Sequence, residues 1–161
     1  MLMPPFELHK PTTVEEACEI AAQLIESGQE FDWIAGGTDI IPNYKWHINT
    51  KPHVISLAGL DGVSAISMNE IGCMARLHDI SVSSEVHPLI AEAASKVASS
   101  LVRRNATLGG NLCLDTRCFW YNQAEEWRSS IDWCHKADCG TGADCRAVSY
   151  THLTLPTRYR V

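Results

Sequence analysis

The chain has 161 residues, 45% hydrophobic and 20% charged, which is a globular composition large enough for one ordinary domain or two small lobes. Its formal net charge of −6 argues against nucleic acid or an anionic membrane as a partner, because both require a basic surface. Its apolar runs are too short to span a membrane and its N-terminus lacks a secretory-signal pattern, so we expect a cytoplasmic protein.

The first third of the chain predicts a helix, a strand and a glycine turn. Thr13 and Glu16 form the T-x-x-E capping pattern, and Gly28 is placed to end the helix that follows. The apolar positions at helical spacing are Val14, Ala17, Ala21, Leu24 and Ile25. Residues 31–35 predict a strand, residues 36–39 predict the turn after it, and a short helix is expected to stop near Pro42.

Short strands and a second helix are predicted farther along the chain. The strand-like segments are residues 53–57, 63–68 and 71–74. A helix is predicted from Pro88, at its first turn, to about Val102. Its expected apolar stripe is Leu89, Ala93, Val97 and Leu101. Together these elements predict a mixed α+β fold.

Two glycine segments are candidates for phosphate binding. They are Ala35-Gly36-Gly37-Thr38-Asp39 and Thr107-Leu108-Gly109-Gly110-Asn111. Backbone amides that point into a concavity bind phosphate, and glycine lets the backbone approach closely. Each segment also offers a threonine hydroxyl and a carboxylate or amide. The residues alone leave open the alternative that both are ordinary tight turns.

Resemblance to a known family favours the first interpretation. Residues 4–7, 11–17, 35–39 and 106–111 resemble the FAD-binding subunit of the xanthine dehydrogenase and carbon monoxide dehydrogenase family, and the match extends from about residue 4 to about residue 149. The resemblance implies the FAD-binding fold of p-cresol methylhydroxylase (PCMH) and vanillyl-alcohol oxidase. It also implies that all ten residues of the two glycine segments bind FAD, around its pyrophosphate. No catalytic residue is expected in this chain.

The cysteines form the third candidate site. Five of the seven lie between residues 113 and 145, and such clusters in a reducing compartment more often bind metal than form disulfides. The spacing C-x15-C-x4-C-x5-C that begins at Cys118 is not a zinc-finger spacing. Structural zinc, and thiols that bind nothing, remain alternatives. Cys113 is expected to be a buried thiol, and His78, His87 and His135 are expected to be packing or surface residues.

The cysteine-rich segment narrows the resemblance. Residues 111–118, 126–128 and 145–149 resemble the medium subunit of 4-hydroxybenzoyl-CoA reductase and its relatives. That resemblance implies an insertion with a [4Fe–4S] cluster held by Cys118, Cys134, Cys139 and Cys145. It further implies partner subunits that carry a [2Fe–2S] centre and a molybdenum cofactor, with ferredoxin as a further candidate partner.

The implied function is electron transfer during reductive dehydroxylation of an aromatic CoA thioester. The alternatives are a flavin subunit of a xanthine, aldehyde or carbon monoxide dehydrogenase, and a non-catalytic zinc-binding interaction module. The expected organisation is a PCMH-type FAD-binding part over residues 1–112, the iron–sulfur insertion over 113–149, and a non-native tail over 150–161. The tail is so interpreted because Tyr150–Thr157 resembles a translated sequencing adapter. A genuine short strand is the alternative.

Overall fold

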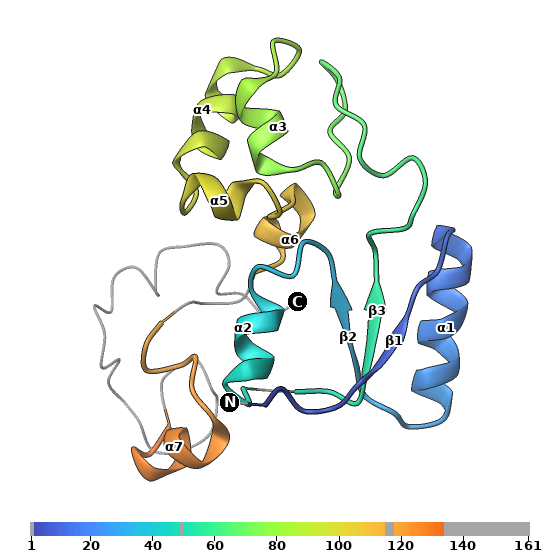
Figure 1. Ribbon diagram of the computed structural model, residues 1–161, viewed down its shortest axis with the longest axis vertical. Coiled ribbons are helices and arrows are strands. Elements are labelled where there is room, and N and C mark those ends of the chain that lie inside the picture. Colours follow the sequence, from blue (N-terminus) through green and yellow to red (C-terminus); the bar gives the residue numbers. More distant parts are fainter. Residues whose placement is uncertain (1, 49, 115–117, 134–161) are drawn as a thin grey trace. The chain divides into compact units, whose positions relative to one another are not determined.

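The computed structural model of the chain describes residues 2–48, 50–114 and 118–133. The chain divides into two compact units, one of residues 4–42 and 50–114, the other of residues 1–3, 43–49 and 115–161. The strands are β1 (Glu7–His9), β2 (Phe31–Ile34) and β3 (His53–Ser56). The helices are α1 (Val14–Glu26), α2 (Ile40–Lys45), α3 (Leu77–Val82), α4 (Pro88–Lys96), α5 (Ser100–Arg103), α6 (Leu108–Leu112) and α7 (Glu125–Ser130). The predicted mixture of helices and strands is confirmed (Figure 1).

The sheet of the larger unit is parallel, with β3 between β1 and β2 (Figure 1). Val54 and Ile55 of β3 are buried on opposite faces of the sheet, as expected for a central strand. The strands predicted over 31–35 and 53–57 are confirmed as β2 and β3, whereas β1 is too short to show a periodic pattern. Because all strands run the same way, the glycine turn after β2 lies at the carboxyl edge of the sheet.

Helix α1 begins with the predicted threonine cap and packs against β3. The Thr13 hydroxyl oxygen accepts from the Glu16 amide at 3.1 Å, and the Glu16 carboxylate accepts from the Thr12 amide at 2.7 Å. The Thr12 backbone hydrogen bond is the main reason that the pKa of Glu16 is lowered. Ala21 and Leu24 pack on Ile55 of β3. The predicted stripe was too wide, because Val14 and Ile25 at its margins are exposed.

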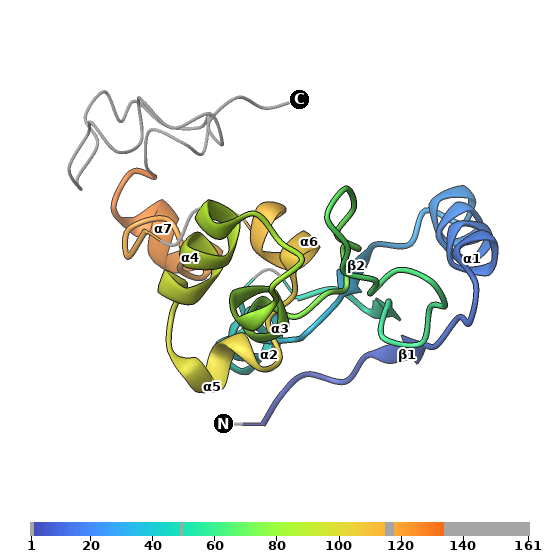
Figure 2. The same cartoon turned by 90° about the horizontal axis from the view of Figure 1, so that it is seen from above.

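Helices α3, α4 and α5 form a group beyond the carboxyl ends of the strands in Figure 1, and Figure 2 shows the same group from above. The single helix predicted over 88–102 is wrong, because the backbone becomes extended at Val97, the C-cap of α4, and Ala98 then has a φ of 46°. The Arg103 guanidinium donates to the carbonyls of Val97 and Ala98 at this break. The predicted stripe is also wrong, since Leu89 and Leu101 are exposed. The buried residues of this core are Ala75, Leu77, Ile80, Val86, Ala94 and Ala106.

The strands predicted over 63–68 and 71–74 are wrong as regular strands. The two segments face each other through hydrogen bonds, such as Gly72 to Ala65 at 2.7 Å, but form only one isolated antiparallel bridge, Ile66 with Ile71. Gly72 is pressed against the backbone of Val63, which leaves no room for a side chain. Residues 63–74 therefore form a narrow hairpin-like loop, although the alternation of apolar residues in the sequence is typical of paired strands.

In the smaller unit, Trp127 of α7 belongs to a cluster of aromatic side chains. The rings of Trp120 and Trp127 lie 5.9 Å apart, and Phe119 meets both rings edge-on. The Arg128 guanidinium lies over Tyr121 and Trp133. Among the residues that the structure describes, no helix is both long and apolar enough to span a bilayer.

Candidate functional site

The first glycine segment, residues 35–39, joins the carboxyl end of β2 to α2. Gly37 has φ 70°, a backbone conformation that side chains disfavour. Gly36 is required for a different reason. A Cβ on Gly36 would overlap the carbonyl oxygen of Asn105, which precedes the second glycine segment. One glycine therefore shapes the turn, and the other allows a close backbone approach.

The second glycine segment was predicted as a loop, but it forms the first turn of α6. Thr107 is the N-cap residue, and its side chain is buried. Four successive amides donate within the protein: Leu108 to Ala75 at 2.9 Å, Gly109 to Cys73 at 2.7 Å, Gly110 to the Thr107 hydroxyl oxygen at 3.1 Å, and Asn111 to the Thr107 carbonyl at 3.0 Å. The Thr107 hydroxyl oxygen therefore caps α6, and its predicted contact with a ligand stays a prediction.

The fold brings the two predicted glycine segments together. Besides the contact of Gly36 with Asn105, a Cβ on Gly110 would lie 3.7 Å from the Cβ of Ala35. Within the described parts of the chain, no protein acceptor is recorded for the amides of Gly36, Gly37 and Thr38. A glycine turn with uncommitted amides fits an anionic phosphate group. The first segment fits this role better than the second, whose amides are committed.

The cysteines are placed only in part. Cys118 is half-buried in the smaller unit, while Cys134, Cys139 and Cys145 lie outside the described residues. The proposed four-cysteine ligand set therefore remains a prediction. Cys113 was expected to be buried, but it is exposed. It is the C-cap residue of α6, where its amide donates to the Gly109 carbonyl at 2.9 Å.

The histidines divide into two groups. His87 caps α4 by accepting from the Leu89 amide at 3.2 Å, so its predicted structural role is confirmed. His78 is half-buried, and His135 lies outside the described residues. Sequence reasoning passed over His9 and His53, whose rings meet across β1 and β3. Glu-x-His in a strand places both side chains on one face, which is the signal that could have drawn attention to them.

A parallel sheet that ends in a glycine turn, joined to a capped glycine helix, defines a class of domain suited to phosphate-bearing cofactors. The chain belongs to the family described as the FAD binding domain in molybdopterin dehydrogenase, whose model matches residues 4–124. The resemblance seen in the sequence is thereby confirmed at the family level.

Individual relatives agree with this assignment. The chain is 33% identical over 119 residues to the carbon monoxide dehydrogenase medium chain of Hydrogenophaga pseudoflava, covering 70% of this chain and 40% of the relative. It is 30% identical over 127 residues to the aldehyde oxidoreductase FAD-binding subunit PaoB of Escherichia coli K12, covering 74% and 38%. The chain thus spans about two fifths of the length of these relatives.

A solved structure shows the same fold. Carbon monoxide dehydrogenase from Hydrogenophaga pseudoflava, in a form that lacks the Mo-pyranopterin moiety of the molybdenum cofactor, superposes with a TM-score of 0.64 at 31% identity. The superposition covers 70% of this chain and 40% of the other. The mixed helix-and-strand architecture described above is therefore that of a flavin subunit of a molybdenum hydroxylase.

Proposed function

We propose that the chain is part of the FAD-binding, electron-transfer subunit of a molybdenum-dependent oxidoreductase. The observation that carries the proposal is the family match over residues 4–124, which includes both glycine segments in contact with each other. The finer fold is proposed to be of the PCMH type, with its N-terminal part over residues 1–112. The proposed compartment is the cytoplasm, where cysteine thiols stay reduced and can bind metal.

The proposed roles of the two glycine segments follow from their hydrogen bonds. FAD supplies the reversible uptake and release of electrons, and the protein supplies binding and orientation. The amides of Gly36, Gly37 and Thr38 would donate to the pyrophosphate, and Asp39 would stand at the end of this turn. The second segment would form the opposite wall of the FAD site, and Gly110 would let the first segment approach closely. This wall consists of Thr107, Leu108, Gly109, Gly110 and Asn111. Ala35, in contact distance of that wall, would set the spacing.

We further propose that residues 113–149 form an insertion with one [4Fe–4S] cluster on Cys118, Cys134, Cys139 and Cys145. Four thiolates are the usual ligand set for such a cluster. Partner subunits would carry a [2Fe–2S] centre and the molybdenum cofactor, and ferredoxin could exchange electrons with the assembly. Residues 150–161 are proposed to be non-native. The resemblance of the cysteine-rich segment supports 4-hydroxybenzoyl-CoA reductase chemistry.

A second candidate is the flavin subunit of a carbon monoxide, aldehyde or xanthine dehydrogenase. The observation in its favour is the identity of about one third to the carbon monoxide dehydrogenase medium chain. In this case no cluster is needed in the chain, and Cys118 would be an ordinary half-buried thiol. A non-catalytic zinc-binding module is the weakest candidate, because the family match is to a flavin domain.

Cofactor analysis of the protein expressed from its native locus tests these proposals. We expect one FAD, together with iron and acid-labile sulfide that disappear in Cys118→Ser, Cys134→Ser, Cys139→Ser and Cys145→Ser. Cys113→Ser is the matched control and should keep the cluster. FAD without iron would favour the second candidate. Zinc without sulfide or flavin would overturn the electron-transfer proposal as a whole.

Substrate assays of the assembled enzyme then separate the two enzymatic candidates. Reduction of 4-hydroxybenzoyl-CoA by a low-potential donor should be observed if the first candidate is right. Reduction of an acceptor dye by carbon monoxide, an aldehyde or xanthine, without 4-hydroxybenzoyl-CoA activity, would establish the second.

A further inference from the structure

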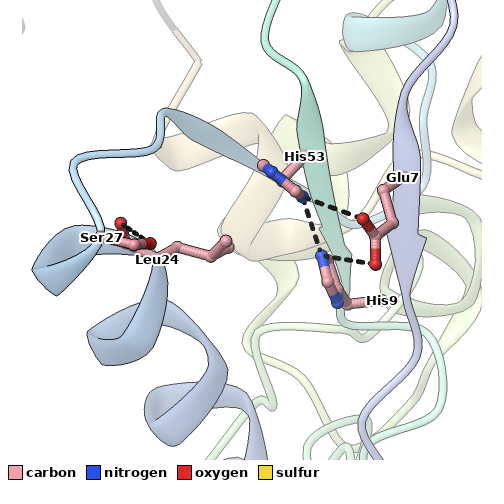
Figure 3. Close-up of polar contacts among 5 residues, drawn as sticks. All are labelled: Glu7, His9, Leu24, Ser27 and His53. Carbon is pink, nitrogen blue, oxygen red and sulfur yellow. Dashed lines mark hydrogen bonds and ion pairs between the residues drawn. The ribbon is translucent and has the colours of Figure 1, made fainter.

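A cluster of three potential metal ligands lies on the parallel sheet, away from the glycine segments. Glu7 and His9 belong to β1, and His53 belongs to β3. Their ligand atoms all lie within 4.8 Å of one another. Figure 3 shows the three side chains turned toward each other, with the carboxylate of Glu7 facing both rings.

Strand register explains why these residues meet. Glu7 pairs directly with His53 in the parallel β1–β3 ladder, so the two side chains leave the sheet on the same face. His9 lies two residues after Glu7 and therefore points to that face as well. It is the face that holds Ile55, against which Leu24 of α1 packs. The three residues are thus held side by side by backbone pairing rather than by flexible loops.

We propose that Glu7, His9 and His53 form a binding site for a divalent transition-metal ion of the zinc type. The Nε2 atom of His9 lies 3.2 Å from the Nδ1 atom of His53. Two nitrogens at zinc–nitrogen bond lengths of about 2.05 Å and a separation of this size subtend about 100° at the metal, close to a tetrahedral angle. The two rings are therefore already spaced as a pair of ligands to one ion.

The carboxylate of Glu7 completes a three-ligand set. Its oxygens lie 3.9 Å from His9 Nε2 and 3.6 Å from His53 Nδ1, within about 0.5 Å of a tetrahedral nitrogen–oxygen separation. The Glu7 side chain is 67% exposed and can close this gap by rotation, whereas the histidines are only 20% and 14% exposed. Two histidines and one carboxylate are a common zinc ligand set, with water in the fourth position.

The site joins two strands that are distant in sequence. A metal bound here would tie β1 to β3 and so stabilise the folded chain, because the unfolded chain does not hold the three ligands together. Glu7 and His53 are the first residues of their strands, while the first glycine segment follows the last residue of β2. The proposed metal site and the proposed flavin site therefore share no residue and can be tested separately.

Zinc binding to the reduced 161-residue chain tests the proposal. We expect Glu7→Gln, His9→Gln and His53→Gln each to weaken one zinc site about tenfold or more in a competition titration. His78→Gln, a half-buried histidine outside the cluster, should leave that site unchanged. Zinc should also raise the melting temperature of the wild type and of His78→Gln by more than it raises that of the three cluster variants.

Cobalt distinguishes this site from one made by the cysteines. The absorption of Co²⁺ bound at the cluster should lack sulfur-to-cobalt charge transfer, and this part of the spectrum should be lost in the three cluster variants. Glu7→Gln guards against unfolding as a trivial cause, because the side chain is exposed and the change is isosteric. Equal zinc affinity in wild type, Glu7→Gln and His9→Gln would overturn the proposal and leave a hydrogen-bonded triad without a metal.

Discussion

The two glycine segments look alike in sequence, but their backbone amides are bonded differently in the fold. In residues 35–39, Gly36 allows a close approach of the backbone at Asn105, and Gly37 adopts a positive φ. The amides of Gly36, Gly37 and Thr38 have no acceptor among the described residues. In residues 107–111, the amides are already bonded to residues 73, 75 and 107. The difference teaches that a Gly-Gly pair can mark either a turn with unbonded amides or the start of a helix whose amides are already bonded.

The largest expected effect is that of Gly36→Ala. The added Cβ would overlap a backbone carbonyl, that of Asn105, which cannot move aside as a side chain would. We expect a loss of about 3 kcal/mol in the free energy of unfolding, measured with denaturant, together with loss of FAD. Gly59→Ala is the matched comparison, because its added Cβ would also approach a backbone oxygen, that of Pro11, but at 3.1 Å and without overlap. Equal stability of the two variants would contradict the close approach of the segments.

Next in size is the effect of Gly37→Val on flavin content. The positive φ of Gly37 and the nearby Ile41 side chain both disfavour a larger residue. We expect most of the bound FAD to be lost from the protein expressed from its native locus. Gly62 has a similar φ of 76° and open space around it, so Gly62→Val reproduces the backbone strain without disturbing the segment. FAD retention in Gly37→Val would remove the first segment from the cofactor site.

Changes in the second segment should mainly affect stability. Thr107→Ala removes the side-chain cap of α6 and should cost about 1 kcal/mol in thermal or chemical unfolding, with FAD retained. Thr107→Ser, which keeps the hydroxyl, is the control. Gly110→Val goes further, because its Cβ would lie 3.0 Å from the Thr107 hydroxyl oxygen and in contact with Ala35 of the first segment, and we expect reduced FAD. Loss of FAD in a stably folded Thr107→Ala would mean that the second segment contacts the cofactor through its cap.

The smallest expected effect is on the pH dependence of stability, and it concerns Glu16 in the cap of α1, far from the glycine segments. The folded-state pKa of Glu16 is lowered from its ordinary value of 4.5, chiefly by the Thr12 backbone hydrogen bond. Its contribution to stability is therefore present above pH 4.5 and is lost as the pH falls through and below that value. Glu16→Gln should flatten this part of the stability profile, as followed by circular dichroism. An unchanged acid profile would show that the hydrogen bond is not maintained in solution.

Sequence patterns over a few neighbouring residues predicted the elements whose ends depend on hydrogen bonds between neighbouring residues or on β-forming side chains. The Thr13–Glu16 pattern located α1, and apolar β-formers located β2 and β3. Helix α4 starts at Pro88 as predicted, but it ends before Val97, where Arg103 donates to the carbonyls of Val97 and Ala98, and no periodicity reveals this contact. The same limit explains the error at residues 63–74, where Gly72 packs on Val63 and prevents a regular ladder.

The candidate site was predictable in composition but not in geometry. Sequence identified both glycine segments, and the fold places them in contact. The sequence could not show that the Thr107 hydroxyl oxygen caps a helix, because this cap depends on the helical path of residues 108–112. Cys113 shows the same limit, since its exposure follows from its place at the end of α6.

The strand order has a consequence for how the domain is made. β1 and β2 have no hydrogen bonds to each other, since both pair with β3, which is the last of the three in the chain. During synthesis neither of the earlier strands can find its partner until β3 has left the ribosome. Every strand contact must then close a long loop, which is the type of topology that folds slowly. The first glycine segment lies inside one such loop, between β2 and β3, so the arrival of β3 also decides when that turn takes its final form.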